Sequence, residues 1–280
     1  MKAIYYNLLA WAILPFMDTI AKYLSSDLSF FQITWARYFF TVVLTLPFMF
    51  VFFRKNLKWT TEPKLQIFRG LLLFFANILF FYSISIISMA KALTLAFVAP
   101  LITTALSPFF LGEKVGLKRW SAVIVGFIGS MIVIRPGFIE FNLATFAALG
   151  TGFFYGIYLI VTRKLHNSDS PLLTLLLTGI VGAIIASFYV HTVWIPLSFN
   201  QWSLLALMGV FACLGHFFLI LSLKHADASK LAPFSYFEIV TNVILGYYFF
   251  SDFPDYLTWL GLFIIVISGV YISFRERLYK

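Results

Sequence analysis

Residues 97–137 read FVAPLITTALSPFFLGEKVGLKRWSAVIVGFIGSMIVIRPG: an apolar run, a short charged turn at 112–119 and a second apolar run. A membrane-spanning helix needs roughly 20 mostly apolar residues, because the hydrocarbon core of a bilayer is ~30 Å thick. Each run, with its apolar flanks, reaches that length, and neither alternates as a strand of a membrane barrel does. The stretch therefore predicts two transmembrane helices joined by a tight turn.

The same pattern continues along the rest of the chain, with short loops between most of the apolar runs. The predicted spans cover residues 3–24, 29–53, 65–87, 89–110, 117–135, 142–163, 170–190, 200–222, 228–250 and 255–274. The first run begins right after Met1 and Lys2, and it is too long for a signal peptide and lacks an A-x-A-like cleavage site. We therefore predict an all-α integral membrane protein with ten transmembrane helices.

The composition agrees with a membrane protein and argues against other classes. Of 280 residues, 61% are hydrophobic, 20% aromatic and 11% charged, and the mean hydropathy is +0.94. Soluble domains carry about 25% charged residues, so these values exclude an ordinary globular enzyme, a disordered protein and a nucleic-acid binder. Cys213 is the single cysteine, which excludes an intrachain disulfide and a multi-cysteine metal site. We expect no metal and no cofactor, and we expect the lipid bilayer as a partner.

The basic residues gather on one side of the predicted bundle. If the N-terminus is inside, 16 of the 20 Lys and Arg residues fall on the cytoplasmic side, as the positive-inside rule predicts. They are Lys2, Arg54, Lys55, Lys58, Lys64, Arg69, Lys114, Lys118, Arg119, Arg163, Lys164, Lys224, Lys230, Arg275, Arg277 and Lys280. Both termini lie on that side, which requires an even number of spans. The net charge of +9 then reflects topology and anionic lipid rather than a polyanionic partner.

A weak repeat divides the chain into two halves. Glu113 recurs 139 positions later as Asp252, and a Lys before it and a Trp after it recur at the same spacing. Each half, residues 1–138 and residues 139–280, holds five predicted spans, so the second half is inverted in the membrane relative to the first. Inverted repeats are typical of transporters, in which the substrate binds between the repeats near the membrane midplane.

These segments resemble a known family. Residues 97–137, with the pattern P…FLGE…W…GF.G…P, and APFSYFEIV at 232–240 with YFFSDFPD at 248–255 are similar to the EamA branch of the drug/metabolite transporter superfamily. Within it, IAKYL at 20–24 and FRGLLLFF at 68–75 are most similar to bacterial S-adenosylmethionine uptake transporters. The resemblance covers essentially the whole chain. It implies a secondary transporter of the inner membrane for S-adenosylmethionine or a similar zwitterionic or cationic metabolite, with amino acids or riboflavin as alternative substrates.

Ionisable residues inside apolar spans mark a candidate site, because each costs about 2.5–3.5 kcal/mol to insert. Glu238 lies near the middle of the ninth span, on one helical stripe with Ser235 and Asn242. Pro233 interrupts this span and Pro100 the fourth, and interrupted spans in both halves point to a transport site. We predict that Glu238 and Asn242 bind substrate and that Glu238 exchanges a proton. The alternative is a protonated Glu238 that only joins helices.

Three further ionisable residues lie inside spans. Asp18 and Arg37 have similar predicted depths on neighbouring helices, so they are expected to form either a structural ion pair or a clamp for a substrate carboxylate. Asp18 is also four residues from Lys22 and is a candidate for simply neutralising it. His216 follows a small-residue face and is either a packed, hydrogen-bonded side chain or a second proton-coupling residue.

Aromatic and amide side chains at mid-depth complete the predicted binding site. The candidates are Trp11, Asn77, Tyr82, Phe97, Tyr155, Tyr158 and Tyr236. For any single one of them, ordinary helix packing is the better explanation. Aromatic faces beside Glu238 suit a cationic or sulfonium ligand through cation–π contacts, and they equally suit a flat heteroaromatic ring. The chain lacks H-E-x-x-H, G-x-S-x-G and paired-aspartate motifs, so we predict no catalytic residue and treat an intramembrane enzyme as a remote alternative.

Overall fold

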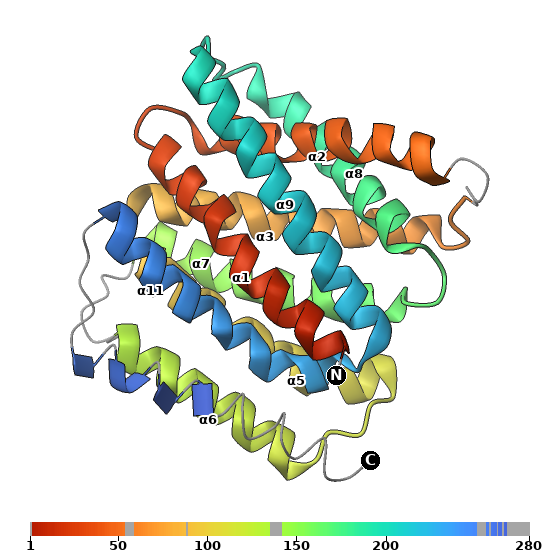
Figure 1. Cartoon of the computed structure of the whole chain (residues 1–280), viewed down its shortest axis with the longest axis vertical. Helices are drawn as coiled ribbons and strands as arrows, with labels where there is room; N and C mark the ends of the chain where they lie inside the picture. Colours follow the sequence, from red (N-terminus) through yellow and green to blue (C-terminus); the bar gives the residue numbers. More distant parts are fainter. Residues whose placement is uncertain are drawn as a thin grey trace.

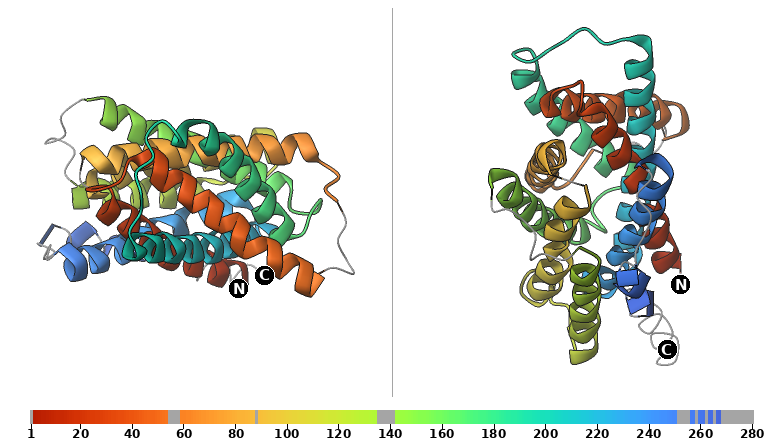
Figure 2. Two further views of the ribbon diagram at one scale, coloured as in Figure 1. Left: turned by 90° about the horizontal axis from the view of Figure 1, so that it is seen from above. Right: turned by 90° about the vertical axis from the view of Figure 1, so that its left-hand side faces the viewer.

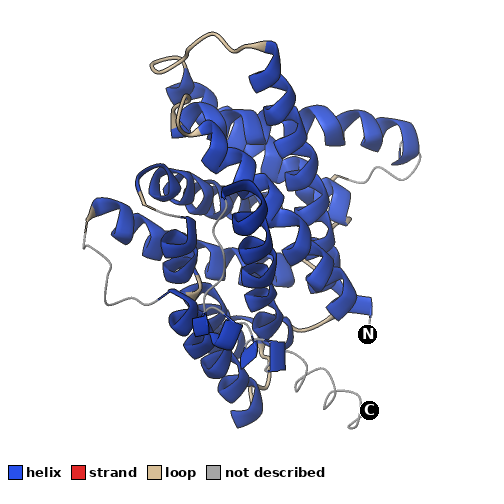
Figure 3. Cartoon of the chain, turned by 60° about the vertical axis from the view of Figure 1, so that its left-hand side comes forward, coloured by secondary structure: helices blue, strands red, loops and turns tan. Residues whose placement is uncertain are grey.

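The structure is a computed structural model, and it describes most of the chain. The described residues are 2–53, 59–87, 89–134 and 142–250, together with 256, 257, 259–261, 263, 264, 266 and 267. All of them lie in helices or in the turns and loops between helices, as Figure 3 shows. The predicted all-α class is therefore confirmed for the part of the chain that the structure describes.

Most predicted spans are single, uninterrupted helices. In the first half these are α1 (Lys2–Leu24), α2 (Phe30–Phe53), α3 (Pro63–Ile86) and α6 (Leu117–Ile134). In the second half they are α7 (Leu143–Lys164), α8 (Pro171–Val190) and α9 (Phe199–His225). Among the described helices, six are long and apolar enough to cross a membrane: α1, α2, α3, α7, α8 and α9. The predicted tenth span, 255–274, lies mostly outside the described residues, and its described positions from 256 to 267 are helical.

Two spans are interrupted, as the prolines predict. The fourth is divided at Phe97 into α4 (Met89–Ala96) and α5 (Val98–Leu111). The ninth is divided into α10 (Ala228–Leu231), the 3-10 helix η3 (Ala232–Tyr236) and α11 (Phe237–Phe250). Pro100 and Pro233 lie within one turn of these breaks, and neither has an N–H to continue the helical ladder. Each interruption therefore follows from a proline inside an apolar run.

Local polar groups fix several of the remaining helix ends. The side chains of Asn142 and Ser170 accept hydrogen bonds from backbone N–H groups in the first turns of α7 and α8. Ser198 and Gln201 form a capping box at the start of α9. Gly112 ends α5 with φ at 66°, in the left-handed region that glycine adopts without steric strain. The turn after α5 is thereby fixed in direction.

The helices pack in pairs around the interrupted spans. α1 lies along α9, α3 along α7, and α2 against α8, and Figure 1 shows α1 in red beside α9 in cyan. α1 also packs against α11, and α7 packs against α5. Seen from above, most helices run in roughly one direction (Figure 2, left), as expected of a membrane bundle. Both interruptions thus lie beside a long helix that belongs to the other half of the chain.

Glycine lets α7 approach the break in the fourth span. A Cβ atom at Gly152 would lie 2.5 Å from the carbonyl oxygen of Ala96, the last residue of α4. One turn later, the hydroxyl of Thr103 donates to the carbonyl oxygen of Gly156 at 3.3 Å. Small residues permit such close backbone contact between membrane helices. The break is therefore fixed against α7, where Phe97 is almost fully buried.

Candidate functional site

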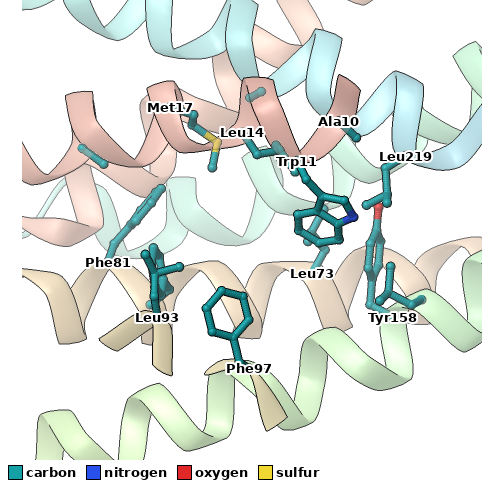
Figure 4. Packing of buried hydrophobic residues seen from close by; sticks show 14 of the residues in the cluster. Ala10, Trp11, Leu14, Met17, Leu73, Phe81, Leu93, Phe97, Tyr158 and Leu219 are labelled. Atoms are coloured by element: carbon teal, nitrogen blue, oxygen red, sulfur yellow. The ribbon is translucent and has the colours of Figure 1, made fainter. Parts of the chain in front are cut away.

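A cavity lies where α1, α3, α7, α9 and the two interrupted spans meet. Its wall includes seven of the predicted site residues: Trp11, Asp18, Asn77, Phe97, Tyr155, His216 and Glu238. Figure 4 shows the apolar packing around this region, with Trp11 of α1 on one side and Leu93 and Phe97 of the interrupted fourth span on the other. Both halves of the chain contribute to the wall, so the cavity lies between them.

Two carboxylates face this cavity. Asp18 of α1 and Glu238 of α11 are 4% and 8% exposed, and they interact electrostatically with each other. Among the described residues, neither carboxylate has a hydrogen bond or an ion pair with a protein group. Burying an unpaired carboxylate is strongly unfavourable. The cavity is therefore a place where a cationic group or a proton would be stabilised.

Lys22 does not neutralise Asp18. Its Nζ atom donates instead to the carbonyl oxygen of Ile84 and, at 3.4 Å, to that of Ile87, both at the end of α3. The interpretation that Asp18 only balances Lys22 was wrong, because the lysine side chain turns toward the helix end and away from the cavity. The carboxyl group of Asp18 is therefore left facing the cavity without Lys22 as a partner.

Arg37 lies behind the cavity wall and is not part of it. The side chain is 2% exposed, with Nη2 at 2.7 Å from Nε2 of His216 and Nε donating to Sδ of Met17 at 3.4 Å. Its guanidinium also lies over the ring of Tyr38, 4.5 Å from the centroid. Arg37 acts on Asp18 electrostatically, without a direct ion pair between these two described residues. Arg37 therefore lies near Asp18, as predicted, but it bonds to His216 and Met17 instead.

His216 connects Arg37 to Tyr158. Arginine can only donate, so Nε2 of His216 accepts the hydrogen bond from Arg37. A neutral imidazole then carries its proton on Nδ1, which lies 3.3 Å from the hydroxyl of Tyr158. Protonating Nε2 would place two donors against each other. The contact favours the packed, hydrogen-bonded role over the proton-coupling role for this histidine.

Arg69 was predicted among the basic residues of the cytoplasmic side, but it is buried inside the bundle. It is fully buried in α3, where Nε donates to Thr162 and Nη2 to Tyr158, each at 2.8 Å, and Nη1 donates to Thr178. All three partners lie on α7 and α8. With Arg37, it places a second positive charge inside the bundle. In the sequence, only its position six residues inside an apolar helix indicated that Arg69 is buried.

The indole of Trp11 is held with its ring toward the cavity. Its Nε1 atom donates to the side-chain oxygen of Asn7 at 3.0 Å, and Asn7 donates in turn to Ser222 of α9 at 3.2 Å. The ring meets that of Tyr155 edge to face, with centroids 6.1 Å apart. Because its polar atom is bonded away from the cavity, Trp11 presents only an aromatic surface to a ligand.

Two predicted residues of the ninth span lie outside the wall. Tyr236 packs against Phe97, with ring centroids 5.5 Å apart. Asn242 donates to the backbone carbonyl of Glu238 at 3.0 Å. Both therefore support wall residues from behind, although Asn242 shares its predicted stripe with the wall residues Ser235 and Glu238.

Comparison with known proteins identifies the family of the chain. The profile of the EamA-like transporter family matches residues 1–135 and 142–274. An S-adenosylmethionine uptake transporter of Rickettsia conorii is 33% identical over 260 residues, which are 93% of this chain and 88% of that protein. A riboflavin transporter of Vibrio cholerae is 33% identical over 184 residues, 65% of this chain and 62% of that protein.

A solved crystal structure of another protein has the same fold. It superposes with a TM-score of 0.77 at 16% identity and covers 99% of this chain and 97% of that chain. The family match, the apolar helices and the named relatives all agree. The chain belongs to the EamA-like transporter family, and it is a multi-pass inner-membrane transporter of a small molecule and not an enzyme.

Proposed function

We propose that this protein is a secondary active transporter that moves S-adenosylmethionine, or a closely similar zwitterionic or cationic metabolite, by alternating access. One observation carries the proposal: Asp18 and Glu238, from opposite halves of the chain, face the same cavity. The named function of the Rickettsia conorii relative supports this choice of substrate.

The chemistry of the cavity suits this ligand. S-adenosylmethionine carries a sulfonium and an ammonium group, which match the two carboxylates, and a flat adenine ring. Trp11, Phe97 and Tyr155 offer aromatic faces in the same wall, and such faces attract both cations and heteroaromatic rings. Riboflavin shares the flat ring but has no cationic group, so the carboxylates favour S-adenosylmethionine.

The proposed architecture is ten spans in two inverted repeats, residues 1–138 and residues 139–280, with both termini in the cytoplasm. The helix pairings support it, since α1 with α9 and α1 with α11 correspond to α7 with α3 and α7 with α5 when the halves are exchanged. Phe97 and Tyr236 are separated by the repeat spacing of 139 positions, and they pack against each other. Rocking of the two interrupted hairpins would open the cavity to one side at a time.

Proton coupling is assigned to Glu238 in this proposal. Its carboxylate faces the cavity beside Asp18, so a bound cation and a proton compete for the same negative charge. His216 is a weaker candidate, because Arg37 occupies its Nε2 atom. Because substrate and proton compete for the same site, binding of one releases the other. The protein would therefore exchange its substrate for a proton or for a counter-substrate.

Uptake into proteoliposomes tests the function. We expect saturable uptake of radiolabelled S-adenosylmethionine and competition by decarboxylated S-adenosylmethionine, which keeps both cationic groups. Competition by S-adenosylhomocysteine, which lacks the sulfonium, should be weaker, and riboflavin and neutral amino acids should not compete. Saturable uptake of riboflavin or an amino acid with none of S-adenosylmethionine would overturn the assignment.

Tyr155→Phe is expected to weaken substrate binding without reducing stability. The Tyr155 hydroxyl is buried and lacks a hydrogen-bond partner among the described residues, while its ring lies in the cavity wall. A bound substrate would supply the missing partner, so the KM for uptake should rise about three- to tenfold. Thermal unfolding in detergent should be unchanged, since the substitution breaks no bond inside the protein.

Tyr236→Phe is the matched control. The Tyr236 hydroxyl is equally buried and equally unpartnered among the described residues, but it lies outside the wall. Its removal should leave KM unchanged. Equal KM values for the parent and the Tyr155 variant, or an equal rise in both variants, would contradict a ligand contact at Tyr155.

A further inference from the structure

Glu113 holds the turn between α9 and α10. It follows Gly112 at the end of α5, and its side chain is 5% exposed. Oε1 accepts a hydrogen bond from the backbone N–H of Ala228 at 2.8 Å, and Oε2 accepts from the N–H and the hydroxyl of Ser229 at 3.0 and 2.6 Å. Hydrogen bonds to a carboxylate are stronger than those between neutral groups. A turn of the first half is thus firmly bonded to a turn of the second half.

Two arginines extend this contact. Asp227 lies between them, with Oδ2 at 3.6 Å from Nη2 of Arg119 and Oδ1 at 3.3 Å from Nη2 of Arg163. Nε of Arg163 is 3.8 Å from Glu113, and Nη1 of Arg119 donates to the Ser229 hydroxyl at 2.9 Å. These five residues form a connected set, the charged clamp: Glu113, Arg119, Arg163, Asp227 and Ser229.

The charged clamp lies beyond one end of the cavity. α5 leads from Pro100, in the cavity wall, to Glu113, about 20 Å further on at a rise of 1.5 Å per residue. Thr104 lies one turn after Pro100 on the same face and is fully buried. α10 and η3 pack against α5 along this stretch. Opening the cavity toward the clamp would therefore require separating the two turns that the clamp joins.

On the other side of the molecule, Lys22 makes the contact that corresponds to one made by Arg163. Nζ of Lys22 donates to the carbonyl oxygen of Ile84, at the end of α3. In the other half, Nη1 of Arg163 donates to the carbonyl oxygen of Leu223, near the end of α9, at 2.8 Å. Each basic residue ends the first helix of its half and contacts the third. The two contacts are equivalent, but only the arginine has further donors for a carboxylate.

The repeat does not preserve the remaining charges of the clamp. The position 139 residues after Arg119 holds Thr258, and the position 139 residues before Asp227 holds Ser88. An uncharged residue thus replaces one arginine and one carboxylate. By sequence, the clamp side therefore carries one arginine and one carboxylate more than the corresponding positions of the other side.

We propose that the charged clamp is the gate on its side of the transport path and that its strength makes the clamp-side-closed conformation the resting state. The empty transporter then loads substrate from the opposite side. Because the clamp lies on the side assigned to the cytoplasm, this resting state suits uptake rather than export. The inference rests on the proposed transport function, and it adds gating residues that do not touch the substrate.

A reporter thiol behind the gate tests the proposal. The parent protein for this experiment carries Cys213→Ser and Thr104→Cys, and its labelling rate by a polar maleimide is measured in detergent without substrate. We expect slow labelling in this parent. Glu113→Gln should accelerate it about tenfold or more, because it removes the negative charge that accepts the three hydrogen bonds, and Ser229→Ala about two- to fivefold, because it removes one hydrogen bond to that carboxylate. Asp169→Asn is the matched control and should leave the rate unchanged.

The control separates gating from general loosening. Asp169 is also a carboxylate joining the halves on this side, where it accepts hydrogen bonds from Thr60 at 2.6 Å and Gln66 at 2.7 Å. Equal acceleration by the Asp169 variant would overturn the proposal, as would parent-like labelling of folded Ser229 and Glu113 variants. If the Glu113 variant fails to fold, the labelling rate of the Ser229 variant alone tests the gate. The labelling needs no substrate, so a negative uptake assay would count against the transport function and not against the gate.

Discussion

Glu238→Gln and Asp18→Asn are each expected to reduce S-adenosylmethionine uptake at least about 30-fold. Removing one partner of a desolvated charge pair costs about 2–5 kcal/mol, and each 1.4 kcal/mol is a factor of about ten in affinity. Both carboxylates face the cavity without a protein partner among the described residues, so a bound cation would lose its counter-charge. The measurement is the initial uptake rate at low substrate concentration in proteoliposomes with matched protein content.

Although they transport less, the Glu238→Gln and Asp18→Asn variants should not be less stable than the parent protein. Two carboxylates on one buried cavity repel each other, and each is unfavourable to bury, so an amide at either position should leave the thermal unfolding temperature unchanged or raise it. Glu62→Gln provides the control, because this exposed carboxylate precedes α3 on the surface. If both cavity variants fold and still take up substrate at the parent rate, the cavity is not the binding site.

The fold could be predicted closely because its signals are local. A span predicted at 65–87 is the helix Pro63–Ile86, and one predicted at 170–190 is Pro171–Val190. Apolar runs of this length have one stable arrangement in a bilayer, since every backbone group must be bonded within the helix. Pro100 and Pro233 mark the interruptions, whereas Pro15, Pro47 and Pro108 lie inside continuous helices, so a proline alone does not decide where a span breaks.

The site could be predicted only in part, because its partners come from distant segments. An ionisable group in an apolar run is a strong local signal, and it identified Asp18 and Glu238. Arg69 was missed, since a basic residue near a helix end usually extends to the membrane surface. Its burial depends on hydroxyls of α7 and α8, about a hundred residues away. For Arg37, depth alone suggested Asp18, whereas its bonded partner, His216, is 179 positions away.

Arg37→Leu is expected to impair folding and uptake together. The substitution removes the hydrogen bond to His216 and leaves Asp18 without the nearby positive charge. Removing one partner from a buried set of charges costs about 3–5 kcal/mol, so the thermal unfolding temperature in detergent should fall clearly. Arg37→Lys keeps the charge and should recover part of that loss, although it cannot reproduce the contacts with both His216 and Met17.

Arg37 has either a structural role behind the wall or a role as a clamp for the substrate carboxylate. The ratio of the affinities for S-adenosylmethionine and its decarboxylated form separates these two roles. The structure places Arg37 behind the wall, with its guanidinium on Tyr38 and its Nη2 atom on His216, so it reaches no substrate carboxylate and both ligands should lose affinity equally in Arg37→Lys. A carboxylate clamp would give the opposite pattern, in which only S-adenosylmethionine binds more weakly and the decarboxylated ligand is unaffected. That selective loss would show that Arg37 moves toward the cavity when substrate binds, because in the observed position it lies outside the cavity wall.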